Sequence, residues 1–193
     1  MVKKYLLTIG DYTRTLDIVP IDEHYAMAAF VLLGDARMTH EAARLLTEKM
    51  PSSFDYIVTP ESMGIPLAHE ISVATLHPEY IILRKSVKVY MKNELSEKYQ
   101  SFENGQENTL YLDGIDADRL KGKKVALVDD VISSGNSMEA AENLMKKAGA
   151  RVVGKLAILA EGEAVNRKDI TVLEGLPLFE VKPDGEFEPI PLD

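Results

Sequence analysis

Short apolar runs alternate with segments of helical spacing along this chain, and this alternation restricts the fold more than any other feature. Four runs rich in Ile and Val, bounded by turn or charged residues, predict buried strands at residues 54–59, 80–83, 124–128 and 152–159. The segments between them place apolar residues on one helical stripe and predict helices at residues 39–50, 65–75 and 137–148. Strand, helix and strand in succession predict an α/β fold, a twisted parallel sheet with helices on both faces.

The predicted topology also indicates where a ligand binds. In parallel α/β sheets, ligands bind beyond the carboxyl ends of the strands. We therefore expect the chemistry in the loops that follow Thr59, Leu83, Val128 and Leu159. Gly149 follows the last predicted helix and is a natural carboxy-terminal cap for it.

The composition is typical of one globular domain, residues 1–193. The chain is 46% hydrophobic and 27% charged, without an internal repeat or a linker rich in Gly, Ser and Pro. No run approaches the roughly 18–20 apolar residues that cross a bilayer, so we expect no membrane association and a cytoplasmic location. The absence of cysteine excludes disulfide frameworks, thiolate nucleophiles and Cys-based zinc sites, and the histidines lack metal-ligand spacing.

The net charge of −9 means that the molecule as a whole repels a phosphate backbone. We therefore expect no nucleic-acid partner. A phosphorylated small molecule can still bind, because backbone N–H groups and a helix amino terminus hold phosphate locally.

The stretch VALVDDVISSGNSM at residues 125–138 carries the strongest chemical signal. A buried strand ends in Asp129 and Asp130, and a loop of small hydroxyl residues then leads into a helix. A carboxylate at a strand end can accept hydrogen bonds from vicinal sugar hydroxyls or from Mg²⁺-bound water. The loop can direct backbone N–H groups and hydroxyls at one phosphate, with Gly135 allowing close approach. Either half alone is typical of a plain turn, but together they predict a site for a phosphate and a ribose.

This stretch resembles the signature with which type I phosphoribosyltransferases bind phosphoribosyl pyrophosphate (PRPP). The resemblance runs from about residue 54 to 159 and is nearest to the purine branch, which includes adenine enzymes and archaeal-type hypoxanthine enzymes. It implies the type I phosphoribosyltransferase fold, transfer of phosphoribose to a purine base in purine salvage, and a homodimer. It also implies that Asp129 and Asp130 hold the ribose hydroxyls and lie in the outer shell of a Mg²⁺ ion that is bound mainly through PRPP. The 5′-phosphate would bind Ser133, Ser134, Gly135, Asn136 and Ser137.

Two further segments agree with the resemblance. TPESMGIP at residues 59–66 is similar to the pyrophosphate loop of the family. Arg84, Lys85 and Lys88 resemble the Arg-Lys pair of adenine-type enzymes, and such cations would stabilise the charge on departing pyrophosphate. Without the resemblance, these segments are an ordinary strand-to-helix turn and a solvated cluster of cations. The loop residues that would bind pyrophosphate are Ser62, Met63 and Gly64.

Residues 86–108 are polar and show neither a helical nor a strand period. They predict a long mobile loop, which is either an active-site lid or a solvated insertion. Within it, SFENG at residues 101–105 is similar to the Glu-containing stretch of adenine enzymes. The similarity implies that Glu103 transfers a proton to the base, and a merely solvated glutamate is the alternative.

No sequence motif identifies which purine base is the substrate. Residues 1–38, with a strand-like segment at 5–9 and a less regular stretch through Pro20, are expected to form a small hood over the base with part of the carboxy terminus. By position, Leu159 and Glu161 would contact the base. Many adenine enzymes have an arginine where this chain has Met63. The larger hypoxanthine-guanine group has an acid where this chain has Ser133. We favour adenine, with hypoxanthine, guanine and xanthine as alternatives.

Two rival functions belong to other classes. A regulator built on the same fold would bind PRPP without transferring it, but such proteins usually carry a DNA-binding domain or a basic RNA-binding face, and this short acidic chain shows neither. A nucleotide-binding dehydrogenase is excluded because no G-x-G-x-x-G follows an early strand. The predicted function is therefore a Mg²⁺-dependent purine phosphoribosyltransferase.

Overall fold

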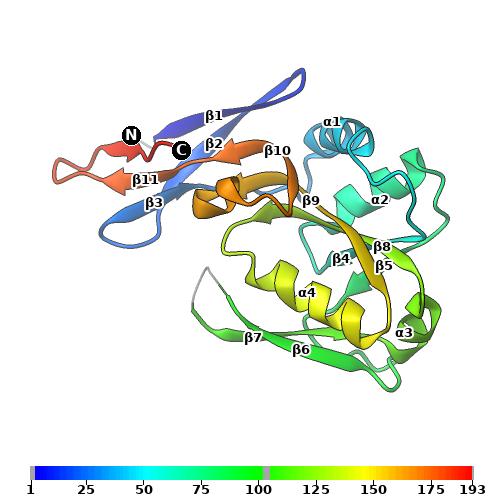
Figure 1. Ribbon diagram of the computed structural model, residues 1–193. Coiled ribbons are helices and arrows are strands. Elements are labelled where there is room, and N and C mark those ends of the chain that lie inside the picture. Colours follow the sequence, from blue (N-terminus) through cyan, green and yellow to red (C-terminus); the bar gives the residue numbers. More distant parts are fainter. Residues whose placement is uncertain (1–2, 102–104, 193) are drawn as a thin grey trace.

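The computed structural model describes residues 3–101 and 105–192, which form two five-stranded sheets and a separate hairpin (Figure 1). The central sheet has the order β10-β9-β8-β4-β5, and all neighbouring strands in it are parallel. The predicted parallel sheet is therefore confirmed. Its strands are β4 (Tyr56–Pro60), β5 (Tyr80–Leu83), β8 (Lys124–Ile132), β9 (Arg151–Glu161) and β10 (Thr171–Leu176).

Strand β8 runs through the middle of the central sheet and is buried on both faces. Because successive side chains point to opposite faces, Ala126 and Val128 pack into one hydrophobic core and Val125 and Leu127 into the other. A strand covered on both faces needs apolar residues at every position, which explains its continuous apolar run.

Helices cover both faces of the central sheet, as the sequence predicts (Figure 1). The side chain of Asp35 caps the first helix by accepting a hydrogen bond from the Met38 N–H at 2.9 Å. Gly149 follows the last helix with φ of +73°, which confirms the predicted cap. No helix in the described part of the chain is long and apolar enough to cross a membrane. One face carries α1 (Ala36–Thr47) and α2 (Ile65–Ala74), and the other carries α3 (Gly114–Leu120) and α4 (Asn136–Lys147).

The second sheet, here named the hood sheet, is antiparallel and combines strands from both ends of the sequence. The strand predicted at residues 5–9 is confirmed, but the expectation of a less regular stretch through Pro20 is wrong. That stretch is a regular strand, because Leu16 and Ile18 are buried in alternation with exposed polar residues. In order across the sheet, the strands are β1 (Lys4–Ile9), β2 (Tyr12–Pro20), β3 (Tyr25–Ala28), β11 (Leu178–Val181) and β12 (Phe187–Pro189).

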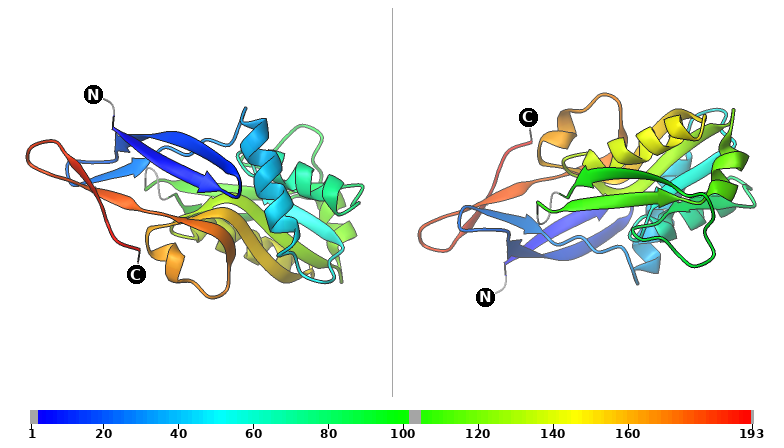
Figure 2. Two further views of the ribbon diagram at one scale, coloured as in Figure 1. Left: turned by 90° about the horizontal axis from the view of Figure 1, so that it is seen from above. Right: turned by 90° about the horizontal axis from the view of Figure 1, so that it is seen from below.

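The segment expected to be a long loop, residues 86–108, contains regular structure instead. An antiparallel hairpin of β6 (Leu95–Gln100) and β7 (Glu107–Leu112) packs along α4 (Figure 2). Polar contacts hold it there, including an ion pair of 2.6 Å between Glu97 and Lys147. Leu95 and Tyr99 of β6 pack against the core, but the half-buried residue between them on the same face is the charged Glu97, so the strand period is not visible as alternating hydrophobicity.

Candidate active site

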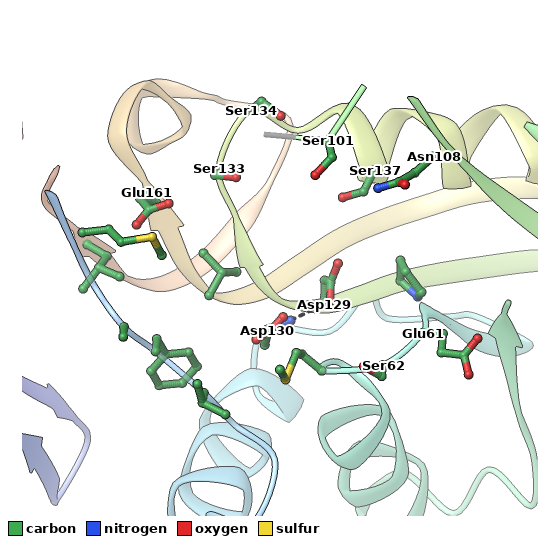
Figure 3. Close-up of a pocket in the computed structure, with 18 of the residues that line it drawn as sticks. Glu61, Ser62, Ser101, Asn108, Asp129, Asp130, Ser133, Ser134, Ser137 and Glu161 are labelled. Atoms are coloured by element: carbon green, nitrogen blue, oxygen red, sulfur yellow. Dashed lines mark hydrogen bonds between the residues drawn. The ribbon is translucent and has the colours of Figure 1, made fainter. Parts of the chain in front are cut away.

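A cavity of about 360 Å³ opens at the carboxyl ends of β4, β8 and β9, the edge at which the topology predicts a ligand site (Figure 3). Strand β3 of the hood sheet and the β6–β7 hairpin contribute to its walls. The cavity brings together segments that are up to about 150 positions apart in the sequence. The predicted site residues that line it are Ser62, Met63, Lys85, Asp129, Asp130, Ser133, Ser134, Ser137 and Glu161.

Asp129 and Asp130 lie at the cavity end of β8, between Ser62 and the loop containing Ser133 (Figure 3). They are only 9% and 8% exposed, and Oδ1 of Asp129 accepts a hydrogen bond from the Asp130 N–H at 3.0 Å. Burial raises the pKa of both carboxyl groups, and the neighbouring charge of Asp130 raises the pKa of Asp129 further. Hydroxyl donors or a cation would compensate for the water that these oxygens have lost.

The loop after β8 leads directly into α4 and has the geometry of an anion site. Gly135 has φ of +80°, in the left-handed region, and immediately precedes the first helical residue, Asn136. The first backbone N–H groups of a helix lack partners within the helix, and together with the helix dipole they attract anions. Ser133, Ser134 and Ser137 line the cavity, whereas Gly135 and Asn136 complete the turn beside it. The side chain of Asn136 instead donates to the Gln100 carbonyl of the hairpin at 3.0 Å.

The loop after β4 faces the acid pair. Glu61, Ser62 and Met63 line the cavity, and the peptide bond between Glu61 and Ser62 is cis. Gly64 packs closely behind them: a Cβ added there would lie 2.4 Å from Oγ1 of Thr59 and 2.9 Å from Oδ1 of Asp129. A glycine at this position therefore allows the loop to approach the acid pair.

The three predicted cations lie together around Glu61, but only one of them lines the cavity. Lys85 lines the cavity, and its backbone N–H donates to Glu61 at 3.0 Å. That hydrogen bond is the main reason why the pKa of Glu61 is lowered. Arg84 and Lys88 do not line the cavity and form ion pairs with Glu61 at 3.4 and 4.0 Å. Glu61 of the loop after β4 therefore connects that loop to the three cations that follow β5.

The opposite end of the cavity is formed by β3, the chain that follows it, and the end of β9. Glu161 is only 4% exposed and lines this end together with Leu176 and the apolar segment 27–31. Leu159, predicted beside Glu161, is fully buried in the core and does not line the cavity. The cavity thus has a polar end for a charged ligand and a more apolar end that contains one carboxylate.

Several residues that line the cavity were not predicted from the sequence. Glu61 was within reach of prediction, because it precedes the predicted Ser62 in the same loop. Tyr99, Gln100, Ser101 and Asn108 enter through the hairpin, which no hydrophobic pattern revealed. The predicted proton-transfer residue, Glu103, lies outside the described residues.

A parallel α/β sheet that presents paired acids and a hydroxyl loop at the carboxyl ends of its strands defines a class of proteins that bind phosphorylated sugars. The chain belongs to the phosphoribosyl transferase domain family, whose sequence profile matches residues 35–186. It is 40% identical over 123 residues to a hypoxanthine/guanine phosphoribosyltransferase of Methanotorris igneus, a match that covers 63% of this chain and 62% of that protein. The corresponding protein of Methanococcus voltae is 31% identical over 149 residues, covering 76% of this chain and 75% of that protein.

Solved structures show the same fold. Adenine phosphoribosyltransferase of Thermoanaerobacter pseudethanolicus matches with a TM-score of 0.66 at 20% identity, over 83% of this chain and 95% of that chain. The adenine enzyme of Giardia lamblia matches with a TM-score of 0.61 at 15% identity, over 89% and 93%. The predicted type I phosphoribosyltransferase fold and the resemblance to the purine branch are therefore confirmed.

Proposed function

We propose that this protein transfers the 5-phosphoribosyl group of PRPP to a 6-oxopurine base, releasing pyrophosphate and forming the nucleoside monophosphate. The observation that carries the proposal is the meeting of the acid pair, the hydroxyl loop and the loop after β4 around one cavity. A molecule with two phosphate-bearing ends and a sugar between them matches that order of groups.

Each part of PRPP has a counterpart in the cavity. Asp129 and Asp130 would accept hydrogen bonds from the two ribose hydroxyls. The helix start at residues 133–137 would hold the 5′-phosphate through N–H groups and hydroxyls. The loop at residues 62–64 and the cation of Lys85 would hold pyrophosphate, with Arg84 and Lys88 adding positive charge nearby.

The carboxyl pair also suits Mg²⁺, which prefers oxygen ligands and usually keeps part of its shell for substrate phosphates. No cluster of three or more His, Cys, Asp or Glu side chains able to hold a metal exists among the described residues. Asp129 and Asp130 would therefore hold the ion only in part, with PRPP supplying most of its ligands. When bound, Mg²⁺ would neutralise charge on the pyrophosphate leaving group.

The protein would accelerate the reaction mainly by positioning. A purine nitrogen displaces pyrophosphate at the anomeric carbon, so the two bound reactants must be held in line. The β6–β7 hairpin would exclude water, which otherwise hydrolyses PRPP. Backbone N–H groups and cations at the pyrophosphate end would stabilise the charge that develops there. Glu103 stays a prediction for proton transfer to the base.

The choice of a 6-oxopurine rests on Glu161 and on the relatives that are named for hypoxanthine and guanine. An ionised carboxylate only accepts hydrogen bonds. Guanine offers it an N1–H and a 2-amino group side by side and hypoxanthine offers the N1–H, whereas adenine offers its 6-amino group beside N1, which is an acceptor. The sequence favours adenine, but the solved adenine enzymes share only 20% and 15% identity and support the fold alone.

Pyrophosphate release with PRPP and Mg²⁺ tests the proposal against hypoxanthine, guanine, xanthine and adenine. Turnover should be highest with hypoxanthine or guanine and should stop on addition of EDTA. It should be lost in Asp129→Asn/Asp130→Asn and kept in Asp118→Asn, an exposed aspartate on α3. Turnover of adenine alone would refute the base assignment, and PRPP binding without turnover of any base would indicate a regulator.

Two further expectations belong to the same proposal. Light scattering on the purified protein tests the homodimer that the resemblance implies. A salvage enzyme works where free bases and PRPP occur, so we also propose a cytoplasmic location, which fractionation of the cells would test.

A further inference from the structure

Arg167 contacts the loop assigned to the 5′-phosphate, although no sequence motif points to it. It follows the short 3₁₀ helix η1 (Gly162–Asn166), which comes directly after β9. A Cβ added to Gly135 would lie 1.9 Å from Nη1 and 3.2 Å from Cζ of Arg167. The guanidinium therefore occupies space that any other side chain at position 135 would need.

An ion-pair network fixes this guanidinium. Nε and Nη2 of Arg167 donate to the two carboxylate oxygens of Asp169 at 3.0 and 2.8 Å. Asp169 also accepts from Nζ of Lys155 on β9 at 2.5 Å, and Lys155 donates to Glu142 on α4 at 3.0 Å. The hydrogen bonds from Arg167 and Lys155 keep the pKa of Asp169 well below its ordinary value. Arg167 is thus tied to both β9 and α4.

The third guanidinium nitrogen is the one that meets the loop. Within the described part of the chain, Nη1 has no hydrogen-bond partner, and it is the atom nearest to Gly135. A free arginine would swing aside at little cost, but the bidentate contact with Asp169 holds this one in place. Its side chain is 29% exposed, so its charge is only partly screened by water.

The positive charge of Arg167 complements the end of the substrate that is assigned to residues 133–137. The 5′-phosphate of PRPP is an anion, and residues 133–137 offer hydroxyls, an amide and backbone N–H groups but no cationic side chain. The cations Arg84, Lys85 and Lys88 lie around the loop after β4, at the end assigned to pyrophosphate.

Building on the proposed function, we propose that Arg167 is a positioning residue for the 5′-phosphate. Held by Asp169, it packs against Gly135, keeps the turn at the start of α4 in its phosphate-binding shape, and adds positive charge there. The role is specific to one end of PRPP and involves neither the base nor pyrophosphate.

The test compares Arg167→Gln with Arg151→Gln, which removes the same charge from an exposed residue at the opposite end of β9. Arg167→Gln should raise the KM for PRPP and the inhibition constant of ribose 5-phosphate about tenfold, which corresponds to about 1.4 kcal/mol of binding free energy. The kcat, the KM of the base and the inhibition constant of pyrophosphate should stay within about twofold. Arg167→Lys and Asp169→Asn both keep a cation at position 167 but lose the bidentate contact between residues 167 and 169. Each should therefore raise the KM for PRPP about threefold.

Two results would overturn the inference. One is a KM for PRPP in Arg167→Gln that equals the value in Arg151→Gln, and the other is an equal rise in the inhibition constants of ribose 5-phosphate and pyrophosphate. Thermal unfolding checks that each variant is folded, and Arg167→Lys replaces Arg167→Gln if the latter is not. If the wild-type protein turns over no purine, the proposed function fails, but calorimetric titration with ribose 5-phosphate still decides the role of Arg167.

Discussion

Replacing Gly64 by alanine tests whether close packing behind the loop after β4 sets the geometry of the site. The backbone of Gly64 has φ of −73° and ψ of −13°, which alanine adopts without strain. The effect must therefore come from contacts. The new methyl group would lie 2.4 Å from Oγ1 of Thr59, and 2.9 and 3.1 Å from Oδ1 and Cα of Asp129.

These contacts are about 0.5–1 Å too short, and the neighbours cannot easily move because both are buried. Overpacking of this kind costs about 1–3 kcal/mol, equivalent to a fall in Tm of roughly 2–12 °C for a domain of this size. If the loop or Asp129 shifts by about 1 Å instead, alignment of the reactants is lost and kcat/KM for PRPP falls about 100-fold.

Gly154→Ala is the matched control, because a Cβ there would lie 2.6 Å from Cγ of Pro51, far from the cavity. Both variants should lose stability in thermal unfolding, but only Gly64→Ala should lose activity in the pyrophosphate-release assay. A kcat/KM in Gly64→Ala within about twofold of the wild-type value would refute the reasoning, as would an equal loss in Gly154→Ala.

Three further predictions follow from burial. A carboxyl group whose pKa is raised in the folded state stabilises the fold at low pH and loses that contribution as pH rises through the raised pKa. Asp129→Asn should therefore raise the Tm of the unliganded protein at pH 7, while kcat/KM falls at least about 100-fold. A lower Tm would contradict this reasoning. In the proposed function, PRPP binds the ionised pair. As the pH is lowered, titration calorimetry should therefore show affinity for PRPP already decreasing at pH values above the ordinary aspartate pKa of 3.8, and a decrease confined to pH values below 3.8 would count against the raised pKa values. Leu127→Ala should lower the free energy of unfolding in urea by about 2–5 kcal/mol because Leu127 is fully buried, and a loss under about 1 kcal/mol would be inconsistent with that packing.

Four strands of the central sheet and the helices α1, α2 and α4 were predictable because their apolar residues are local and periodic, whereas β10 and α3 were not predicted. The boundaries were less so: β8 was expected to end at Val128, but it continues to Ile132. Asp129 and Val131 remain paired with β9, and ladder hydrogen bonds are indifferent to whether the side chain is charged. The acid pair therefore projects from the strand itself, which holds it more rigidly than a loop would.

Other parts of the site depend on contacts that a sequence pattern does not encode. The contacts of the hairpin with α4 include the ion pair of Glu97 with Lys147, and Arg167 reaches Gly135 across 32 positions of the chain. At the end of β9, Leu159 and Glu161 share a strand face because they are two residues apart. Whether that face is core or cavity at each position depends on where the hood sheet lies, so Leu159 does not reach the cavity, whereas Glu161 lines it and its contact with a base stays a prediction.

The pairing of β3 with β11 places Met27 opposite Leu178, so the apolar end of the cavity is completed by residues from near both ends of the sequence. During synthesis, a ribosome exposes the parallel sheet strand by strand. Strand β3 can pair with β2 at once, but almost the whole chain must be synthesised before its second partner, β11, exists. Closing a loop of that length is slow compared with local folding. The nascent protein should therefore form most of the central sheet first, and the apolar end of the cavity should be the last part of the molecule to mature.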